Sequence, residues 1–161
     1  MEVKNDEFLK YFYERKDKAE NLYKSRPKIY NPYLKCEVIL NSDGFHHLQF
    51  KARSERDKKA QLLKFSLLPL AFKIINNSGT LQEYRKGLIT VGKKGIKDGL
   101  SLTKFVDYWG FIAIVGQKQV KIRVVLKRAG DGNVIFWSVM LYSKLKNNSK
   151  QKLYTENIED E

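Results

Sequence analysis

The sequence predicts an α+β fold in which N-terminal helices pack on one face of a twisted antiparallel β-sheet. Two helical patterns occupy much of the first half of the chain, at residues 6–25 and from Glu55 to Asn77. Three runs of β-branched and aromatic residues, separated by two Gly-containing turns, follow at residues 105–142. After Tyr142 the composition becomes polar. We therefore expect one α+β domain over residues 1–142 and a flexible C-terminal tail over residues 143–161.

The elements before the second helix are signalled by their turn residues. The first helix is expected to end before Pro27. Residues 33–40 are then typical of a strand, and the turn signal N-S-D-G follows at 41–44. The segment F-H-H-L-Q-F-K-A-R at 45–53 fits neither the helical nor the strand period. It could be a returning strand or the approach to a helix.

The second helix is predicted to begin at Glu55, because Ser54 with Asp57 three residues later resembles an N-cap. Its apolar residues surround most of the circumference, which indicates packing in the core. Pro69 is expected to kink or split it. Residues 80–104, rich in glycine and lysine, are interpreted as a basic loop region.

The three runs at 105–142 predict an antiparallel meander. If Val115 pairs with Val120 and Gly130 with Asn133, alternate residues form a dry face. This face consists of Trp109, Phe111, Ala113, Ile122, Val124, Leu126, Trp137, Val139 and Leu141. The opposite, basic and aromatic face collects Tyr108, Lys121, Arg123, Lys127, Phe136, Ser138 and Tyr142. A three-residue second turn would instead exchange the two faces of the last strand.

The net charge favours an anionic partner. The chain has 31 Lys and Arg against 18 Asp and Glu, a balance of +13, which is typical of proteins that bind nucleic acid or an acidic protein. No apolar run suits a membrane span. The N-terminus lacks a secretory signal, and the single Cys36 has no disulfide partner. We therefore expect a cytoplasmic protein in which Cys36 is a buried structural thiol.

Several kinds of chemistry find little support in the residues. His46 and His47 are adjacent and Cys36 is alone, so no metal site is predicted. Ser138 lacks a nucleophile elbow, and the acids form no catalytic pair. The G-K-K-G sequence is not a nucleotide-binding P-loop, and no cofactor is predicted.

Histidine and cations remain, and metal-free RNA cleavage uses both. The reaction needs a base for the 2′-hydroxyl, an acid for the 5′-oxygen and cations for the phosphorane. His46 and His47 are candidate bases, and on an extended segment only one would face the site; we favour His47. Arg123 should project from the middle strand, so its truncation should cost little stability. The predicted nucleic-acid ligands are Lys51, Arg53, Arg85, Lys93, Lys94, Lys121 and Lys127.

A family resemblance rests on H-H-L after the first strand, P-L-A-F-K-I-I on the long helix, L-Q-E-Y-R beyond it, and V-D-Y-W-G-F-I-A-I, K-I-R-V-V and F-W-S-V-M in the meander. Over about residues 33–142 this layout resembles the barnase, EndoU, colicin and RelE superfamily of metal-independent nucleases, in particular its toxin-like, mobile-element members. The resemblance implies a barnase/RelE-like fold and an endoribonuclease, often the toxin of a toxin–antitoxin pair, with RNA and an acidic antitoxin as partners.

The family's roles map onto His46 or His47, Arg123 and Ser138, with Arg53 and Arg85 nearby. The meander has no second histidine, so the acid role would pass to Tyr108 or to a cation.

Two other functions fit the composition. A non-catalytic nucleic-acid-binding module would stack bases on Tyr108, Phe136 and Tyr142 while lysines and arginines hold the backbone. An interaction subunit would use the same basic face to hold an acidic partner.

Overall fold

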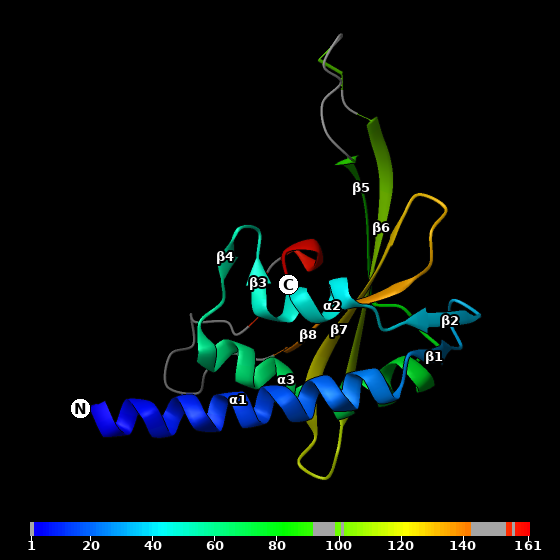
Figure 1. The fold of residues 1–161 in the computed structure, drawn as a ribbon. Helices are drawn as coiled ribbons and strands as arrows, with labels where there is room; N and C mark the ends of the chain where they lie inside the picture. Colours follow the sequence, from blue (N-terminus) through cyan, green and yellow to red (C-terminus); the bar gives the residue numbers. More distant parts are fainter. Residues whose placement is uncertain (1, 92–98, 101, 143–153, 156) are drawn as a thin grey trace.

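The computed structural model describes residues 2–91, 99–100, 102–142, 154–155 and 157–161. These residues form an α+β fold, which confirms the predicted class. The helices are α1 (Glu2–Ser25), α2 (Ser42–Gln49), α3 (Lys58–Asn77) and the short 3-10 helix η1 (Ile158–Asp160) (Figure 1). The strands are β1 (Lys28–Asn31), β2 (Cys36–Ile39), β3 (Phe50–Lys51), β4 (Ser54–Glu55), β5 (Glu83–Val91), β6 (Leu102–Val115), β7 (Val120–Ala129) and β8 (Ile135–Leu141).

The main sheet has six strands in the order β1-β2-β8-β7-β6-β5. It is mixed rather than fully antiparallel, because β2 meets β8 in parallel at Ile39 and Ile135. The other neighbouring pairs are antiparallel. Since β2 contacts β8 at this one position, most of the outer edge of β8 is left to the helices. The strands β3 and β4 form a separate two-stranded sheet.

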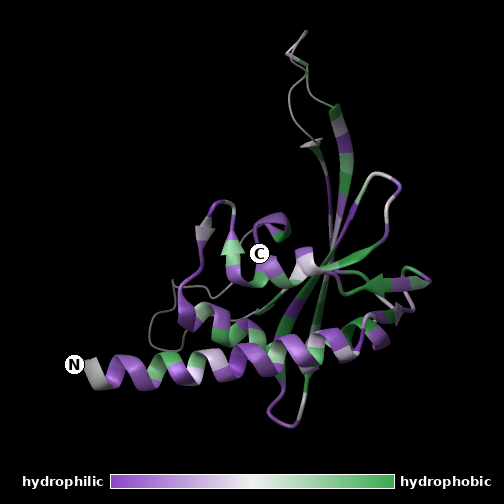
Figure 2. Ribbon diagram, viewed as in Figure 1, coloured by the Kyte–Doolittle hydropathy of each residue, from purple (hydrophilic) through white to green (hydrophobic). Residues whose placement is uncertain are grey.

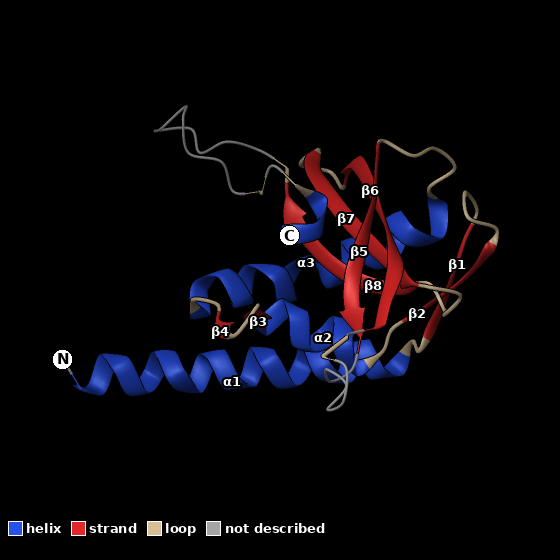
Figure 3. Cartoon of the chain, turned by 90° about the horizontal axis from the view of Figure 1, so that it is seen from above, coloured by secondary structure: helices blue, strands red, loops and turns tan. Residues whose placement is uncertain are grey.

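The helices α1, α2 and α3 pack against one face of the sheet, called the inner face here, and share one core with it. Buried residues of this core include Phe12 of α1, Leu68 and Phe72 of α3, and Phe111 and Val124 of the sheet. Figures 1 and 3 show α1 lying along α3. In Figure 2, α1 is mostly hydrophilic with hydrophobic residues at intervals, as expected of a helix that covers the core from outside. None of the described helices is long and apolar enough to cross a membrane.

Several boundaries differ from the expectation. Residues 28–39 form the hairpin β1-β2 rather than one strand. The segment at 45–53, which fitted neither period, begins within the helix α2, because the side chain of Asn41 accepts a hydrogen bond from the backbone N–H of Gly44 and caps this helix. Asp57 caps α3, while Ser54 belongs to β4. Pro69 lies inside one continuous helix, on its exposed side.

The meander forms as predicted up to a bulge in its last strand. Val115 pairs with Val120, as expected. The register between β7 and β8 shifts between Val125 and Leu126, so that Leu126 pairs with Phe136 and not with Trp137. Phe136 is therefore buried in the inner core, and the expectation that Phe136 lies on the basic face and Trp137 on the dry face was wrong.

The expectation of a loop region over residues 80–104 was also wrong in part. Residues 83–91 form β5, which pairs with β6 along its whole length. Figure 1 shows the outer ends of these two strands extending beyond the rest of the fold. Lys93 and Lys94 lie outside the described residues.

Candidate anion-binding site

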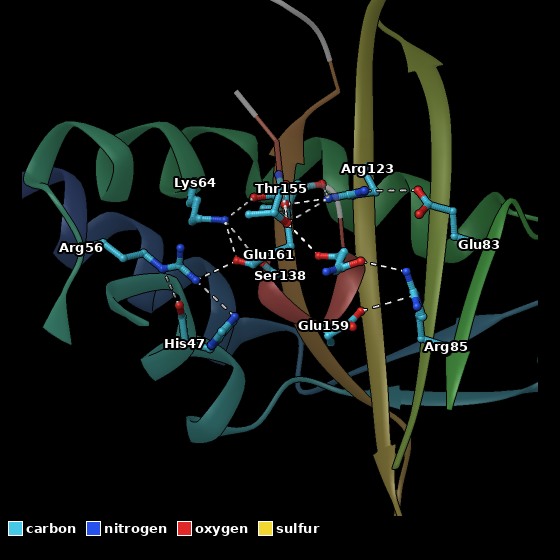
Figure 4. Close-up of polar contacts among 12 residues, drawn as sticks. His47, Arg56, Lys64, Glu83, Arg85, Arg123, Ser138, Thr155, Glu159 and Glu161 are labelled. Atoms are coloured by element: carbon cyan, nitrogen blue, oxygen red, sulfur yellow. Dashed lines mark hydrogen bonds and ion pairs between the residues drawn. The ribbon is translucent and has the colours of Figure 1, made fainter. Parts of the chain in front are cut away.

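A cluster of cations lies at the edge and outer face of the sheet, on the side away from the helical core. It consists of Arg56, Lys64 and Arg123, called the cation cluster below, with the hydroxyl of Ser138 between them (Figure 4). Arg123 comes from the middle strand β7 and Ser138 from β8. Lys64 reaches Ser138 from the first half of α3, which is possible because the edge of β8 carries no strand beyond Ile135.

Arg123 is the most enclosed of the three cations, with an exposed side-chain fraction of 1%. Its Nη2 donates to the Glu161 carboxylate at 2.7 Å and to the backbone oxygen of Thr155 at 2.7 Å. Its Nη1 lies 3.3 Å from the carboxylate of Glu83 on β5. The expectation that truncating Arg123 would cost little stability is therefore wrong, because its removal leaves the buried carboxylate of Glu161 without a charge partner.

Lys64 is buried and makes three contacts through its ammonium group. The Nζ atom donates to Ser138 Oγ at 2.9 Å, to the backbone oxygen of Val139 at 3.1 Å and to that of Glu161 at 3.4 Å. Burial, reinforced by the charge of Arg56, lowers the pKa of Lys64 to about 7. With all three donors engaged, Lys64 does not act as a base toward Ser138 in this arrangement.

His47 lies beside the cluster on α2. Its ring stacks on Trp137 at 3.9 Å between centroids, and its Nε2 lies 3.2 Å from Nη2 of Arg56. Because an arginine carries only donors, this nitrogen is the acceptor. Burial and the charges of Arg56 and Lys64 lower the pKa of His47 to about 3, so the ring is neutral at pH 7.

An acidic stretch of the chain covers the cation cluster. It consists of Tyr154, Thr155 and Asn157–Glu161, called the acidic segment below. Ile158 is fully buried against Val106, Tyr108 and Val125 of the outer face. This differs from the expected flexible tail for these residues; residues 143–153 and 156 lie outside the described part of the chain.

The acidic segment contacts cations at two places. Glu161 meets Arg123 through its carboxylate, and Arg56 donates to its backbone oxygen at 2.7 Å. Arg85 of β5 donates to the Asn157 side chain at 2.8 Å and lies 3.8 Å from the Glu159 carboxylate. Arg123 and Arg85 thus each have a carboxylate of the acidic segment as a partner.

The other predicted site residues lie around this centre or apart from it. Tyr108 is nearly buried beneath Ile158, and burial raises the pKa of its hydroxyl. Lys127 places its Nζ 3.8 Å from the ring centroid of Trp137. Lys121 lies on the ring of Tyr142 at 4.9 Å. The exposed residues Lys51 and Arg53 belong to the small sheet and its turn.

The two histidines lie on the helix α2, so the extended segment from which only one of them was expected to face the site does not form. His46 is exposed and stacks on Phe50. Both histidines line a cavity of 630 Å³ with Lys51, Lys127 and Trp137, and Glu159 borders it. The cavity adjoins the cation cluster through His47.

Sequence reasoning missed Arg56 as a contact of His47, and Lys64 and Glu161 altogether. Lys64 lies on the buried face of α3 with the apolar residues Leu67 and Leu68 nearby, and a lone cation on such a face was the available signal. Glu161 gave no signal, because its stretch has the composition of a solvated tail.

Within the described ranges, no three His, Cys, Asp or Glu side chains gather as metal ligands. The absence of metal and cofactor stays a prediction. Comparisons of the chain with protein-family models, with curated proteins and with solved structures find no match, so the resemblance to metal-independent nucleases also stays a prediction.

Proposed function

We propose that this protein is a metal-independent endoribonuclease that cleaves RNA by attack of the 2′-hydroxyl. The convergence of Arg56, Lys64 and Arg123 with Ser138 and His47 is the observation that carries the proposal. Three cations close together suit a phosphorane, whose equatorial oxygens gain negative charge. Because the site is largely closed to water, each charge interaction there is stronger than at the surface.

The pKa values of two groups in the site indicate different roles. His47 is neutral at pH 7 and so has an acceptor nitrogen, and its pKa rises from about 3 when Arg56 moves to the phosphate, because the Arg56 charge lowers it here. Lys64, with a pKa of about 7, is about half protonated at pH 7 and can donate a proton. In the proposed reaction the 2′-oxygen attacks phosphorus and the bond from phosphorus to the 5′-oxygen breaks. When RNA binds, Arg56 turns from Nε2 of His47 to the phosphate, which frees this nitrogen to take the 2′-proton. Lys64 protonates the 5′-oxygen, which leaves a 2′,3′-cyclic phosphate.

The remaining residues would bind and orient the phosphate. Arg123 and Arg56 supply N–H donors for its oxygens, and Ser138 supplies a hydroxyl fixed by Lys64. Ser138 is buried in a strand, so it orients a neighbour and does not attack. Tyr108, which the sequence offered as an acid, faces Ile158 and is left out of the proposed proton transfers.

The alternative of a base-stacking module is disfavoured by burial. Of its three predicted aromatic residues, Phe136 has an exposed fraction of 0% and Tyr108 of 9%. Base stacking needs an accessible ring face. The third, Tyr142, packs on Tyr154 at 4.2 Å between ring centroids.

We also propose, on the resemblance, that the enzyme is a toxin that acts on cytoplasmic RNA and is held by an acidic antitoxin. The net charge of +13 supports an acidic partner.

The test is cleavage of single-stranded RNA in EDTA by the full-length protein and by its Glu161→Gln variant, with the ends analysed for 2′,3′-cyclic phosphate. Lys64→Met and His47→Ala in that background should each lower the rate by about 10²- to 10⁴-fold, the range for loss of a general acid or base. Lys59→Met, on the exposed side of α3, is the matched control. No cleavage by either starting protein would refute the proposal.

The pH dependence tests the role of Lys64. An acid with a pKa of about 7 loses its proton as the pH rises, so kcat/KM should fall above about pH 7. Residual activity of Lys64→Met should lack this decline. A decline that persists in Lys64→Met would assign it to another group.

A further inference from the structure

We infer that the cation cluster and Arg85 bind successive phosphates of one RNA strand, and that the acidic segment occupies this track in the present structure and must leave for RNA to bind. The inference rests on the proposed function for the identity of the ligand. Glu161 at Arg123 and Glu159 at Arg85 are the two carboxylates that stand in for phosphates.

The fit between Arg123 and Glu161 is incomplete. Among the described residues, Nε of Arg123 and Oε1 of Glu161 have no hydrogen-bond partner, although both atoms are buried. The carboxylate engages the guanidinium through the single oxygen Oε2, whereas an arginine can offer two parallel N–H bonds to an anion. A phosphate has more oxygens in a tetrahedral arrangement and can reach both Nη2 and Nε. The arginine is therefore better suited to a phosphate than to its present partner.

Arg56 and Lys64 also bind the acidic segment, through the backbone oxygen of Glu161. All three members of the cation cluster therefore converge on this one residue. Burial is the largest cause of the lowered pKa of Lys64, so the cluster is desolvated. An anion placed there is attracted more strongly than at the surface.

An apolar contact holds the acidic segment on the sheet, so this segment competes with RNA for the cations. Ile158 packs between Val106 and Val125, and a Cβ placed on Gly110 would lie 3.2 Å from its Cγ2. Because the segment belongs to the same chain, its local concentration is on the order of millimolar, so RNA must displace it. RNA affinity is thus lowered by whatever stabilises the acidic segment.

The first test measures binding alone, with a fluorescent single-stranded RNA decamer whose 2′-oxygens are methylated and which therefore cannot be cleaved. Glu161→Gln removes the charge that pairs with Arg123, so the affinity should rise by about 10-fold or more, the effect of one weakened charge-assisted hydrogen bond. Glu83→Gln is the matched control, because Glu83 also pairs with Arg123 but belongs to β5. Its affinity should stay within about 2-fold of the starting protein.

The control separates displacement from a simple change of charge. An equal rise in Glu161→Gln and Glu83→Gln would mean that lost negative charge near Arg123, and not release of the acidic segment, raises the affinity. That result, or no rise in either variant, would overturn the inference.

The second test locks the acidic segment in place. Gly110→Cys and Ile158→Cys, in a chain with Cys36→Ser, are suited to a disulfide, because the Cβ built on Gly110 lies 3.2 Å from Cγ2 of Ile158, which is bonded to the Cβ that would carry the second sulfur. A Cβ at Gly110 would also lie 3.1 Å from Cβ of Glu83, so that side chain must shift by a few tenths of an ångström. The oxidised protein should bind the decamer at least about 10-fold more weakly than the same protein after reduction. Equal affinities, with the disulfide verified by mass spectrometry, would overturn the inference.

The two proposals fail separately. Tighter binding by Glu161→Gln without cleavage of ordinary RNA would leave the phosphate track standing and refute the nuclease. Cleavage of ordinary RNA, with a binding affinity that neither Glu161→Gln nor the disulfide alters, would support the nuclease and refute the phosphate track.

Discussion

The acid sensitivity of folding should depend on His47. Its ring is 8% exposed, stacks on Trp137 and has a pKa lowered from 6.5 to about 3, mainly by burial. In the unfolded chain the ring regains the ordinary pKa of 6.5 and binds a proton near pH 6. The unfolded state therefore binds more protons than the folded state below pH 6.5. The stability that comes from the neutral ring is complete above this pH and is lost as the pH falls toward 3.

The size of the effect follows from the two pKa values. At pH 5 the unfolded ring is 1.5 pH units below its pKa of 6.5, and each unit corresponds to about 1.4 kcal/mol, so the loss is about 2 kcal/mol. Any folded-state pKa below about 4 gives the same loss at pH 5, because the folded ring stays neutral there. Most carboxyl groups titrate below this pH. Lys64, with a pKa of about 7, titrates in the window from pH 7 to 5, but it does so both in the starting protein and in a variant of His47, so the difference between the two isolates the histidine.

Urea unfolding, followed by tryptophan fluorescence at several pH values between 5 and 7.5, measures this loss. His47→Gln keeps a hydrogen-bond acceptor for Arg56 but does not titrate, so its stability should be flatter over the window by about 2 kcal/mol. His46→Gln is the control, because that ring is exposed. Parallel curves for the starting protein and His47→Gln would refute the assignment of the buried ring, and so would a flat curve in His46→Gln.

Three other results are expected. Arg123→Met should lower the free energy of unfolding by up to about 3–5 kcal/mol, because it leaves the Glu161 carboxylate buried and unpaired; the double variant with Glu161→Leu should recover much of this in urea unfolding. Gly44→Ala should destabilise the protein by about 1–3 kcal/mol or more, because its Cβ would lie 2.2 Å from the backbone oxygen of Phe136, while Gly79→Ala, with open space around it, should be tolerated in the same thermal unfolding assay. The affinity of Glu161→Gln for RNA should fall with salt, with a slope of about 0.7 per phosphate contact in a plot of log affinity against log salt; a flat plot would contradict phosphate binding.

The strands of the meander were predictable because each alternates apolar and polar residues between clear turns. The tight turn after Val115 fixed the first register, and with it Arg123 on the outer face. The bulge in β8 opposite Val125 and Leu126 was not predictable, since it leaves one residue, Trp137, unpaired without changing the composition of the strand. The bulge reaches the candidate site, because it turns Trp137 outward, where the ring stacks on His47.

The helix ends show a different limit of local patterns. Ser54 and Asp57 both suit an N-cap, and the choice between them depends on β3 and β4, which pair through Ser54 and Lys51. Likewise, an asparagine at position 41 suits both a turn and a helix N-cap. In both places a contact that forms only in the folded chain decided between two patterns that the sequence permits equally.

The position of the acidic segment on the sheet was not predictable, and the reason is electrostatic. Its composition alone suits a solvated tail, and Glu161 has no apolar neighbour in sequence except Ile158. In a chain of net charge +13, however, the acidic residues are attracted to the surface as a whole, and the most favourable place for them is where cations are desolvated. Ile158 adds a buried apolar contact that fixes the position. The same concentration of buried positive charge that suits a phosphate therefore also binds the chain's own carboxylates, which explains why the candidate site and its cover coincide.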